Sequence, residues 1–235
     1  HIGPLVNVLA VIATAFGVAA SLGMGALQIN SGLNAVLGLP VSQTSQLGII
    51  GVTTVLFLTS AVSGVTKGIK WLSTFNLIVA ALLALAVFIL GPTVAIIDTL
   101  TSTLGSYASE FVRMSLRMTP FRDSQWVGGW TIFYWAWWVS WSPFVGLFIA
   151  RVSRGRTVRE FILGTVAAPT IAAFVWFSVF GGTALHMEIM QHVPIADAVK
   201  ADVSTALFAM FDQLPLGTLM SGIATILVIV FFVTS

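Results

Sequence analysis

No cysteine occurs in the 235-residue sequence, which excludes disulfide frameworks, iron–sulfur clusters, thiolate metal sites and cysteine nucleophiles. Charge is scarce as well: Asp, Glu, Lys and Arg form 8% of the chain, whereas a soluble domain carries about 25%. The net charge is only +2, too small for a patch that binds the phosphates of a nucleic acid. Hydrophobic residues form 57% of the chain, so the sequence predicts an all-α polytopic membrane protein, a helical bundle in lipid.

Apolar stretches long enough to cross a bilayer, which takes about 20 residues, occur six times. Many Gly, Ala and Ser residues lie within them, as suits close helix packing in lipid. An amphipathic spacing of three or four residues over 94–118 predicts a further helix that lies on the outer face, and residues 195–213 predict a shorter one. We expect a single transmembrane domain over 1–235, with spans at 5–28, 47–65, 71–91, 127–150, 161–183 and 216–235.

Basic residues are concentrated in two turns that fall on the same side of the predicted bundle. These are the turn with Lys67 and Lys70 and the turn from Arg151 to Arg159. The segments on the opposite side carry an excess of acidic residues. The positive-inside rule therefore places the two basic turns in the cytoplasm, and we expect a multi-pass protein of the cell (inner) membrane.

Ionisable residues are missing from the six predicted spans, so the sequence gives no support for a proton relay. His186 and His192 lie on either side of Glu188, but solvated loop residues explain this trio better than a metal site does. Neither a Ser/His/Asp set nor an HExxH pattern is present. We therefore expect neither an enzyme nor a bound cofactor.

Tryptophan is the unusual component of the fourth span, because six of the eight Trp residues lie within 126–141. An interfacial aromatic belt explains Trp126 and Trp130, but Trp137, Trp138 and Trp141 lie too deep in the span for that. Aromatic faces at this depth suit a cation without hydrogen-bond donors, such as a quaternary ammonium group. From the residues alone, a cation–π site and plain aromatic packing remain equally good explanations.

Helical spacing arranges these rings on two adjacent faces of the span. Tyr134, Trp138 and Trp141 share one face, and Trp137, Trp141 and Phe144 share the other. Pro143 lies just beyond the cluster, where it removes a main-chain hydrogen bond, frees a carbonyl near Val139 and favours a kink.

Serine and threonine residues on the first and last spans have two possible roles, ligands of a cation or donors of a hydrogen bond to their own helix. Thr14 and Ser21 could ligate a hard cation through oxygen, although such hydroxyls more often bond to their own helix. The last span ends with Thr234 and Ser235, to which the same choice applies.

Two motifs in the fourth span and the turn after it are specific. Residues 135–146 have the sequence WAWWVSWSPFVG, and residues 150–161 have the sequence ARVSRGRTVREF. Together with residues 17–32, 63–73, 180–183 and 232–235, they resemble the betaine/choline/carnitine transporter family over essentially the whole chain. The resemblance implies a leucine-transporter-like fold with two inverted five-helix repeats, of which this chain matches the family's fifth to tenth spans. The sequence begins at His1 and stops within an apolar run, so we expect a fragment of a longer transporter.

The resemblance implies a secondary symporter of quaternary ammonium osmolytes, above all sodium-coupled glycine betaine uptake. It implies a homotrimer in which the helix at 94–118 contributes contacts, and Na+ as the coupling ion. The basic turn at 151–159 could contact anionic membrane lipid or regulatory termini, although a topology signal explains it more simply.

The resemblance also assigns roles residue by residue. Trp138 matches the main cation–π residue of the substrate site, and its neighbours Trp135, Trp137 and Trp141 match residues that line the site and the pathway. The implied sodium ligands are Thr14 and Phe144 at one site, and Phe231, Thr234 and Ser235 at half of the second site.

Val18 departs from the family pattern, because sodium-coupled members have a second threonine at this position. A valine has no side-chain oxygen, so the first sodium site is in question. A sodium-independent or proton-coupled choline or carnitine transporter or exchanger is therefore the first alternative. The second is a non-transporting membrane scaffold whose tryptophans only pack helices.

Overall fold

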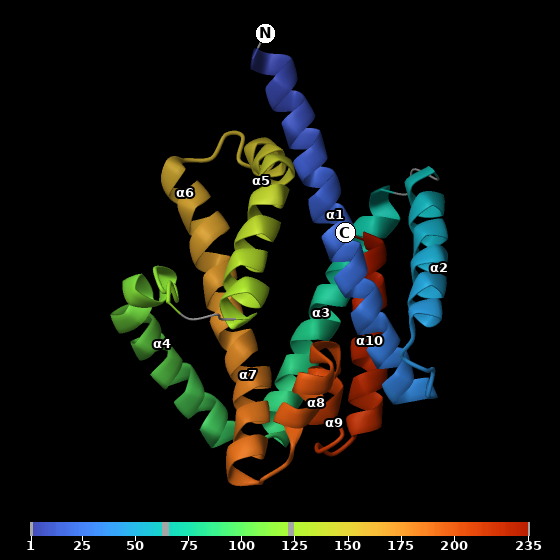
Figure 1. The fold of residues 1–235 in the computed structure, drawn as a ribbon, viewed down its shortest axis with the longest axis vertical. Coiled ribbons are helices and arrows are strands. Elements are labelled where there is room, and N and C mark those ends of the chain that lie inside the picture. Colours follow the sequence, from blue (N-terminus) through green and yellow to red (C-terminus); the bar gives the residue numbers. More distant parts are fainter. Residues whose placement is uncertain (1, 63–65, 122–124, 235) are drawn as a thin grey trace. The chain divides into compact units, whose positions relative to one another are not determined.

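A computed structural model of the chain describes residues 2–62, 66–121 and 125–234. The side chains of residues 2, 60–62 and 66–70 are outside this description. Helices form all the regular secondary structure of the described residues. This confirms the all-α fold class expected from the composition. The long helices are α1 (Ile2–Leu37), α2 (Gln43–Val62), α3 (Thr66–Leu90), α4 (Thr93–Ser115), α5 (Phe133–Val152), α7 (Ala168–Met190) and α10 (Gly217–Thr234), shown in Figure 1. The short elements are the helices α6 (Val158–Ile162), α8 (Ile195–Ala201) and α9 (Ala206–Phe211), the π-helical turns η1 (Val127–Ile132) and η2 (Leu163–Ala167), and the 3-10 turn η3 (Val203–Thr205).

Five stretches of helix in the described part of the chain are long and apolar enough to cross a membrane: Gly3–Leu37, Trp71–Leu90, Val127–Val152, Val158–Met190 and Gly217–Thr234. The remaining expected span, 47–65, falls on α2 and ends in residues outside the described ranges. The protein is therefore a multi-pass membrane protein built from apolar helices.

Two helices continue beyond the ends expected from hydropathy. α1 runs to Leu37 rather than 28, and α7 runs to Met190 rather than 183. α1 stops where Gly38 takes the left-handed conformation, with φ +69°, and the N–H groups of Gly38 and Leu39 bond back to the last turn. The end of α1 is thus set by loop geometry rather than by the end of an apolar run.

The segment 195–213, expected as one short helix on the outer side, contains α8 and α9 separated by η3. Asp202 interrupts the helix because its backbone is extended, with φ −156°. Its carboxylate accepts hydrogen bonds from the N–H of Ser204 at 2.8 Å and from the Ser204 hydroxyl at 2.6 Å. The Ser204 hydroxyl in turn lies 2.5 Å from that of Ser31, which ties this segment to α1.

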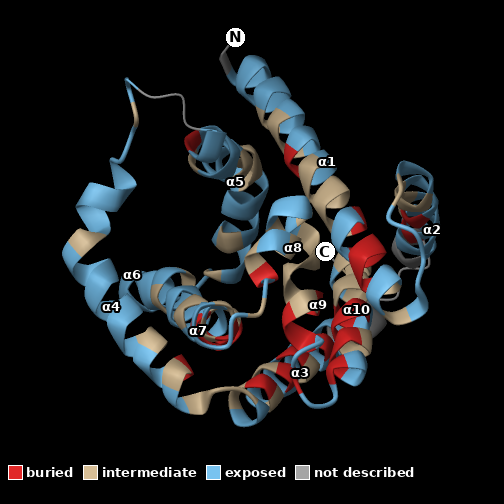
Figure 2. Ribbon diagram, turned by 60° about the horizontal axis from the view of Figure 1, so that its bottom comes forward, coloured by how far each residue is buried: buried red, intermediate tan, exposed pale blue. Residues whose placement is uncertain are grey.

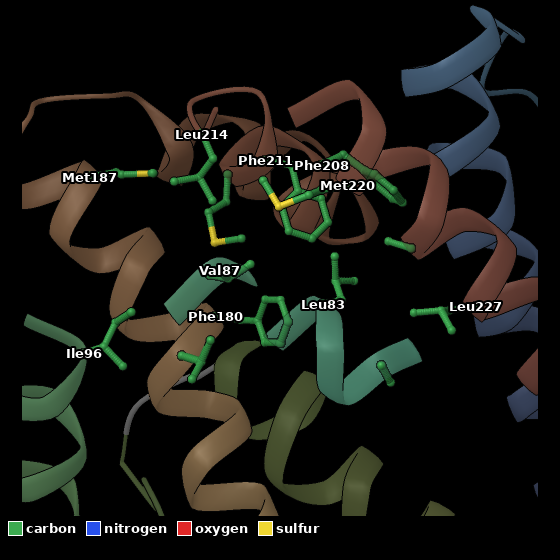
Figure 3. Packing of buried hydrophobic residues seen from close by; sticks show 14 of the residues in the cluster. Leu83, Val87, Ile96, Phe180, Met187, Phe208, Phe211, Leu214, Met220 and Leu227 are labelled. Atoms are coloured by element: carbon green, nitrogen blue, oxygen red, sulfur yellow. The ribbon is translucent and has the colours of Figure 1, made fainter. Parts of the chain in front are cut away.

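The chain forms two compact units, of which one comprises residues 22–103 and 174–235. Within it, α10 packs against α3, α2 and α9. Buried apolar side chains from α3, α7, α9 and α10 form one cluster, in which Phe180 and Phe211 meet edge to face at a centroid distance of 6.3 Å (Figure 3). The Asn76 side chain, only 1% exposed, joins α3 to α10 by donating to the Leu227 carbonyl at 3.3 Å.

The other unit comprises residues 1–21 and 104–173. Of its described residues only Gly17 and Val127 are buried, and α5 has no buried residue at all (Figure 2). Apolar side chains on a membrane helix can face lipid or other helices without the penalty that water imposes. The aromatic face of α5 is therefore held by a few specific contacts rather than by a core.

Candidate substrate and ion sites

The tryptophan-rich segment forms α5, and Pro143 lies inside that helix. Proline has no N–H, so the carbonyl of Val139, four residues earlier, loses its helical donor. The Ser142 hydroxyl replaces that donor and reaches the Val139 oxygen at 2.7 Å. The carbonyl that the sequence predicted to be freed is thus satisfied by the residue next to the proline.

Ring contacts follow one side of α5. Trp130 stacks on Tyr134 at 5.8 Å with an interplanar angle of 5°. Trp137 contacts Tyr134 at 5.7 Å and Phe133 at 6.3 Å. Further along, Trp141 meets Phe144 at 5.6 Å and 70°.

Ser21 of α1 connects these two groups of rings. The indole Nε1 of Trp137 and that of Trp141 each donate to the Ser21 oxygen at 3.1 Å. The Ser21 hydroxyl itself donates to the Gly17 carbonyl at 3.0 Å. All three residues belong to the same compact unit.

Gly17 permits this contact between α1 and α5. A Cβ atom at this position would lie 2.8 Å from the Ser140 hydroxyl and 3.2 Å from the Trp141 ring. The sequence suggested Ser21 either as a cation ligand or as a hydroxyl bonded to its own helix; the bond to the Gly17 carbonyl matches the second alternative, and the bonds from the two indoles were not foreseen. The pair Gly17 and Ser21, four residues apart, was the available signal, because small residues at this spacing let helices approach closely.

Trp138 and Trp135 lie differently from their neighbours. Their side chains are 70% and 65% exposed, and neither makes a ring contact among the described residues. The structure thus divides the four tryptophans expected at the substrate site into two pairs. Trp137 and Trp141 are fixed to α1, and Trp138 and Trp135 present open aromatic faces.

The expected sodium ligands use their hydroxyl protons on their own helices. Thr14 Oγ1 donates to the Ala10 carbonyl at 2.8 Å, and Thr234 Oγ1 donates to the Val230 carbonyl at 2.8 Å. The structure records no direct interaction between Thr14 and Phe144. Phe231 is 44% exposed, and Ser235 lies outside the described residues.

One of the loop residues considered for a metal site has a structural partner. Glu188, between the two histidines, accepts a hydrogen bond from the N–H of Ala196 at 2.8 Å and so holds the start of α8. No group of three His, Cys, Asp or Glu able to hold a metal occurs among the residues that the structure describes.

In the basic turn, Thr157 and Glu160 form a capping box at the start of α6, and the four arginines of that turn are exposed.

Comparison with known proteins decides the family. The family model described as BCCT, the betaine/carnitine/choline family transporter, matches residues 1–235. The chain belongs to the BCCT family. This confirms the resemblance expected from the tryptophan motif, and the family's members are described as transporters rather than enzymes.

Several relatives of this BCCT chain are identified by substrate. The chain is 49% identical to the glycine betaine transporter OpuD of Bacillus subtilis, covering 100% of this chain and 46% of OpuD. It is 47% identical to an ectoine/hydroxyectoine transporter of Virgibacillus pantothenticus, over 100% of this chain and 47% of that protein. It is 46% identical to glycine betaine transporter 1 of Vibrio parahaemolyticus, over 99% of this chain and 44% of the relative. The chain therefore spans less than half the length of these relatives.

Proposed function

We propose that this chain is part of a secondary active transporter that takes up a quaternary ammonium osmolyte, glycine betaine, together with sodium across the cell membrane. Family membership and the glycine betaine transporters among the relatives support this class of substrate. The observation that carries the proposal is the open pair of indoles on α5, Trp135 and Trp138, because it offers aromatic faces with no polar partner among the described residues.

A trimethylammonium group has no N–H, so it gains nothing from hydrogen-bond acceptors. It is attracted by the negative face of an indole, and that attraction is worth about 2 kcal/mol or more when the site is desolvated. Trp138, the most exposed tryptophan of α5, is the proposed primary contact. The other proposed substrate-site residues are Trp135, Trp137, Trp141 and Tyr134.

Sodium binding is proposed at Thr14 with Phe144, and at Phe231, Thr234 and Ser235. Each threonine donates its proton to its own helix, which leaves the oxygen lone pairs directed away from that bond and free to accept a hard cation. Alternating access would then move helices around a site near the membrane midplane.

A homotrimer is the proposed assembly, with α4 contributing contacts. Ile97, Leu104 and Phe111 of α4 are spaced at seven residues and are all exposed. They form an apolar stripe along one side of this helix.

The proposed function is tested in a transport-deficient bacterium that expresses a full-length transporter containing this chain. Uptake of radiolabelled glycine betaine is measured in sodium and in potassium buffer, with unlabelled choline, carnitine and ectoine as competitors, and uptake of these three is then measured with each compound labelled. Trp138→Ala should lower uptake at low substrate concentration about 30-fold, which corresponds to about 2 kcal/mol of lost cation–π attraction. Trp71→Ala is the matched control, because Trp71 is similarly exposed on α3 but stacks on Phe75. Unchanged uptake by the Trp138 variant at normal expression contradicts the proposal.

Val18 favours a second candidate, a sodium-independent or proton-coupled choline or carnitine transporter or exchanger. This side chain is 38% exposed and offers no oxygen beside Thr14. Equal uptake in sodium and potassium supports this candidate, and loss of that uptake on collapsing the proton gradient identifies the proton-coupled form. A wild-type protein that takes up none of the four compounds supports the membrane-scaffold alternative.

A further inference from the structure

We infer that Ser21 is a positioning residue for the aromatic binding surface of α5. Its hydroxyl fixes the indoles of Trp137 and Trp141 and does not itself ligate sodium in this conformation. The inference rests on the proposed function for its effect on transport, but its structural part can be measured separately.

The hydrogen-bonding capacity of the Ser21 hydroxyl is fully used. A serine hydroxyl has one proton to donate and two lone pairs to accept with. The proton goes to the Gly17 carbonyl at 3.0 Å. The two lone pairs receive the N–H groups of Trp137 and Trp141, each at 3.1 Å. No lone pair remains for a cation, in contrast to Thr14, whose one recorded hydrogen bond uses only its proton.

The two anchored indoles are the central members of the ring contacts along α5. Trp137 contacts Phe133 and Tyr134, and Trp141 contacts Phe144. No ring contact joins Trp137 to Trp141 in the described part of the chain. The Ser21 oxygen is therefore the atom that joins the two groups of rings, the one around Trp137 and the one around Trp141, and holds them in one orientation.

Burial does not provide this restraint. No residue of α5 is buried within this chain, and Trp137 and Trp141 are only half-buried, so a packed core of this chain does not by itself fix the indole rotamers. Preorganised side chains avoid the entropic cost of immobilising a rotamer-rich group when a ligand binds. Loss of the Ser21 hydroxyl should therefore weaken substrate binding rather than slow the transport cycle.

The test compares Ser21→Ala, Ser21→Thr and the wild type in the full-length transporter, at saturating sodium. Each hydrogen bond between membrane helices is worth about a threefold change in an equilibrium. Losing both bonds should therefore raise KM for glycine betaine about tenfold in Ser21→Ala with little change in Vmax. Ser21→Thr, which keeps the hydroxyl, should restore KM. Thr170→Ala is the matched control, because its hydroxyl bonds only to the Val166 carbonyl of its own helix.

Double variants separate positioning from a general structural effect. With Trp137→Phe and Trp141→Phe together, both N–H donors are absent, so Ser21→Ala should cause no further rise in the dissociation constant of glycine betaine measured by equilibrium binding. A further rise of the same size refutes the inference. A Ser21→Ala variant that changes only the sodium concentration for half-maximal uptake also refutes it, because that result identifies Ser21 as an ion ligand.

A spectroscopic measurement keeps the inference independent of transport. The indole N–H hydrogen-bond band in the ultraviolet resonance Raman spectrum should shift in Ser21→Ala and return in Ser21→Thr. If the wild type transports none of the compounds tested, the proposed function fails while this shift still supports the anchoring of the indoles. If the band does not move, the anchoring fails even where glycine betaine uptake is normal. If Ser21→Ala is absent from the membrane fraction, Trp141→Phe replaces it in the comparison with Ser21→Thr. The indole band should then shift in Trp141→Phe and should not shift in Ser21→Thr.

Discussion

Ser142 should matter for stability only while Pro143 is present. The proline leaves the Val139 carbonyl without its main-chain donor, and the Ser142 hydroxyl occupies that carbonyl at 2.7 Å. In lipid no water is available to replace a lost donor. Ser142→Ala should therefore lower the free energy of unfolding, whereas Pro143→Ala returns an N–H to the Val139 carbonyl and should make the serine dispensable.

The expected magnitude follows from one hydrogen bond in a membrane helix. Such bonds contribute about 0.6 kcal/mol on average and at most about 1.7 kcal/mol. Ser142→Ala should lower the unfolding free energy by about this amount with Pro143 in place, and by close to zero in the Pro143→Ala background. The coupling between the two substitutions should thus equal nearly the whole effect of the first.

The assay is equilibrium unfolding of the full-length transporter in mixed micelles by titration with sodium dodecyl sulfate. Ser140→Ala is the control: its hydroxyl also bonds to a carbonyl of α5, that of Trp137 at 2.7 Å. That carbonyl keeps its helical donor from Trp141, so the control should change stability less. An equal loss from Ser142→Ala in both backgrounds would falsify the account of the proline.

Two further predictions concern the ion site and the contact between α3 and α10. Val18→Thr places a hydroxyl one helical turn from Thr14, and it should lower the sodium concentration for half-maximal uptake several-fold; an unchanged value argues against sodium at this position. Asn76→Ala removes the hydrogen bond to Leu227 and leaves a small cavity, so it should lower the unfolding free energy by about 1–2 kcal/mol. Asn7→Ala, at an exposed position, should cost nothing in the same titration, and equal losses from both variants count against the role of Asn76.

The fold class and the composition of the aromatic cluster could be predicted from the sequence, because both depend on local pattern. Scarce charge and long apolar runs indicate membrane helices, and the family motif identifies Trp138 and its neighbours. Helix ends were less predictable: α1 extends to Leu37 because Gly38, and not the loss of hydrophobicity, ends it.

Contacts between helices could not be predicted from the sequence. Which hydroxyl meets which indole depends on how α1 faces α5, and no local pattern encodes that pairing. Thr14 and Ser21 look alike in the sequence, yet Thr14 bonds only to its own helix whereas Ser21 also accepts two indole N–H groups. The roles proposed for the sodium ligands and for Trp138 remain predictions.

The π-helical turn η1, Val127–Ile132, allows the helix that continues into α5 to change in length. It contains Gly128 and Gly129 and continues directly into α5. A π-helical turn accommodates one more residue than an α-helical turn, so it is equivalent to an insertion that the helix has absorbed. Deleting one residue here would restore regular α-helix and rotate Trp126 by about 100° relative to the rest of α5. Ser21, Trp137 and Trp141 would keep their register, so the N-terminal end of this helix can vary in length and facing during evolution while the anchored indoles stay in place.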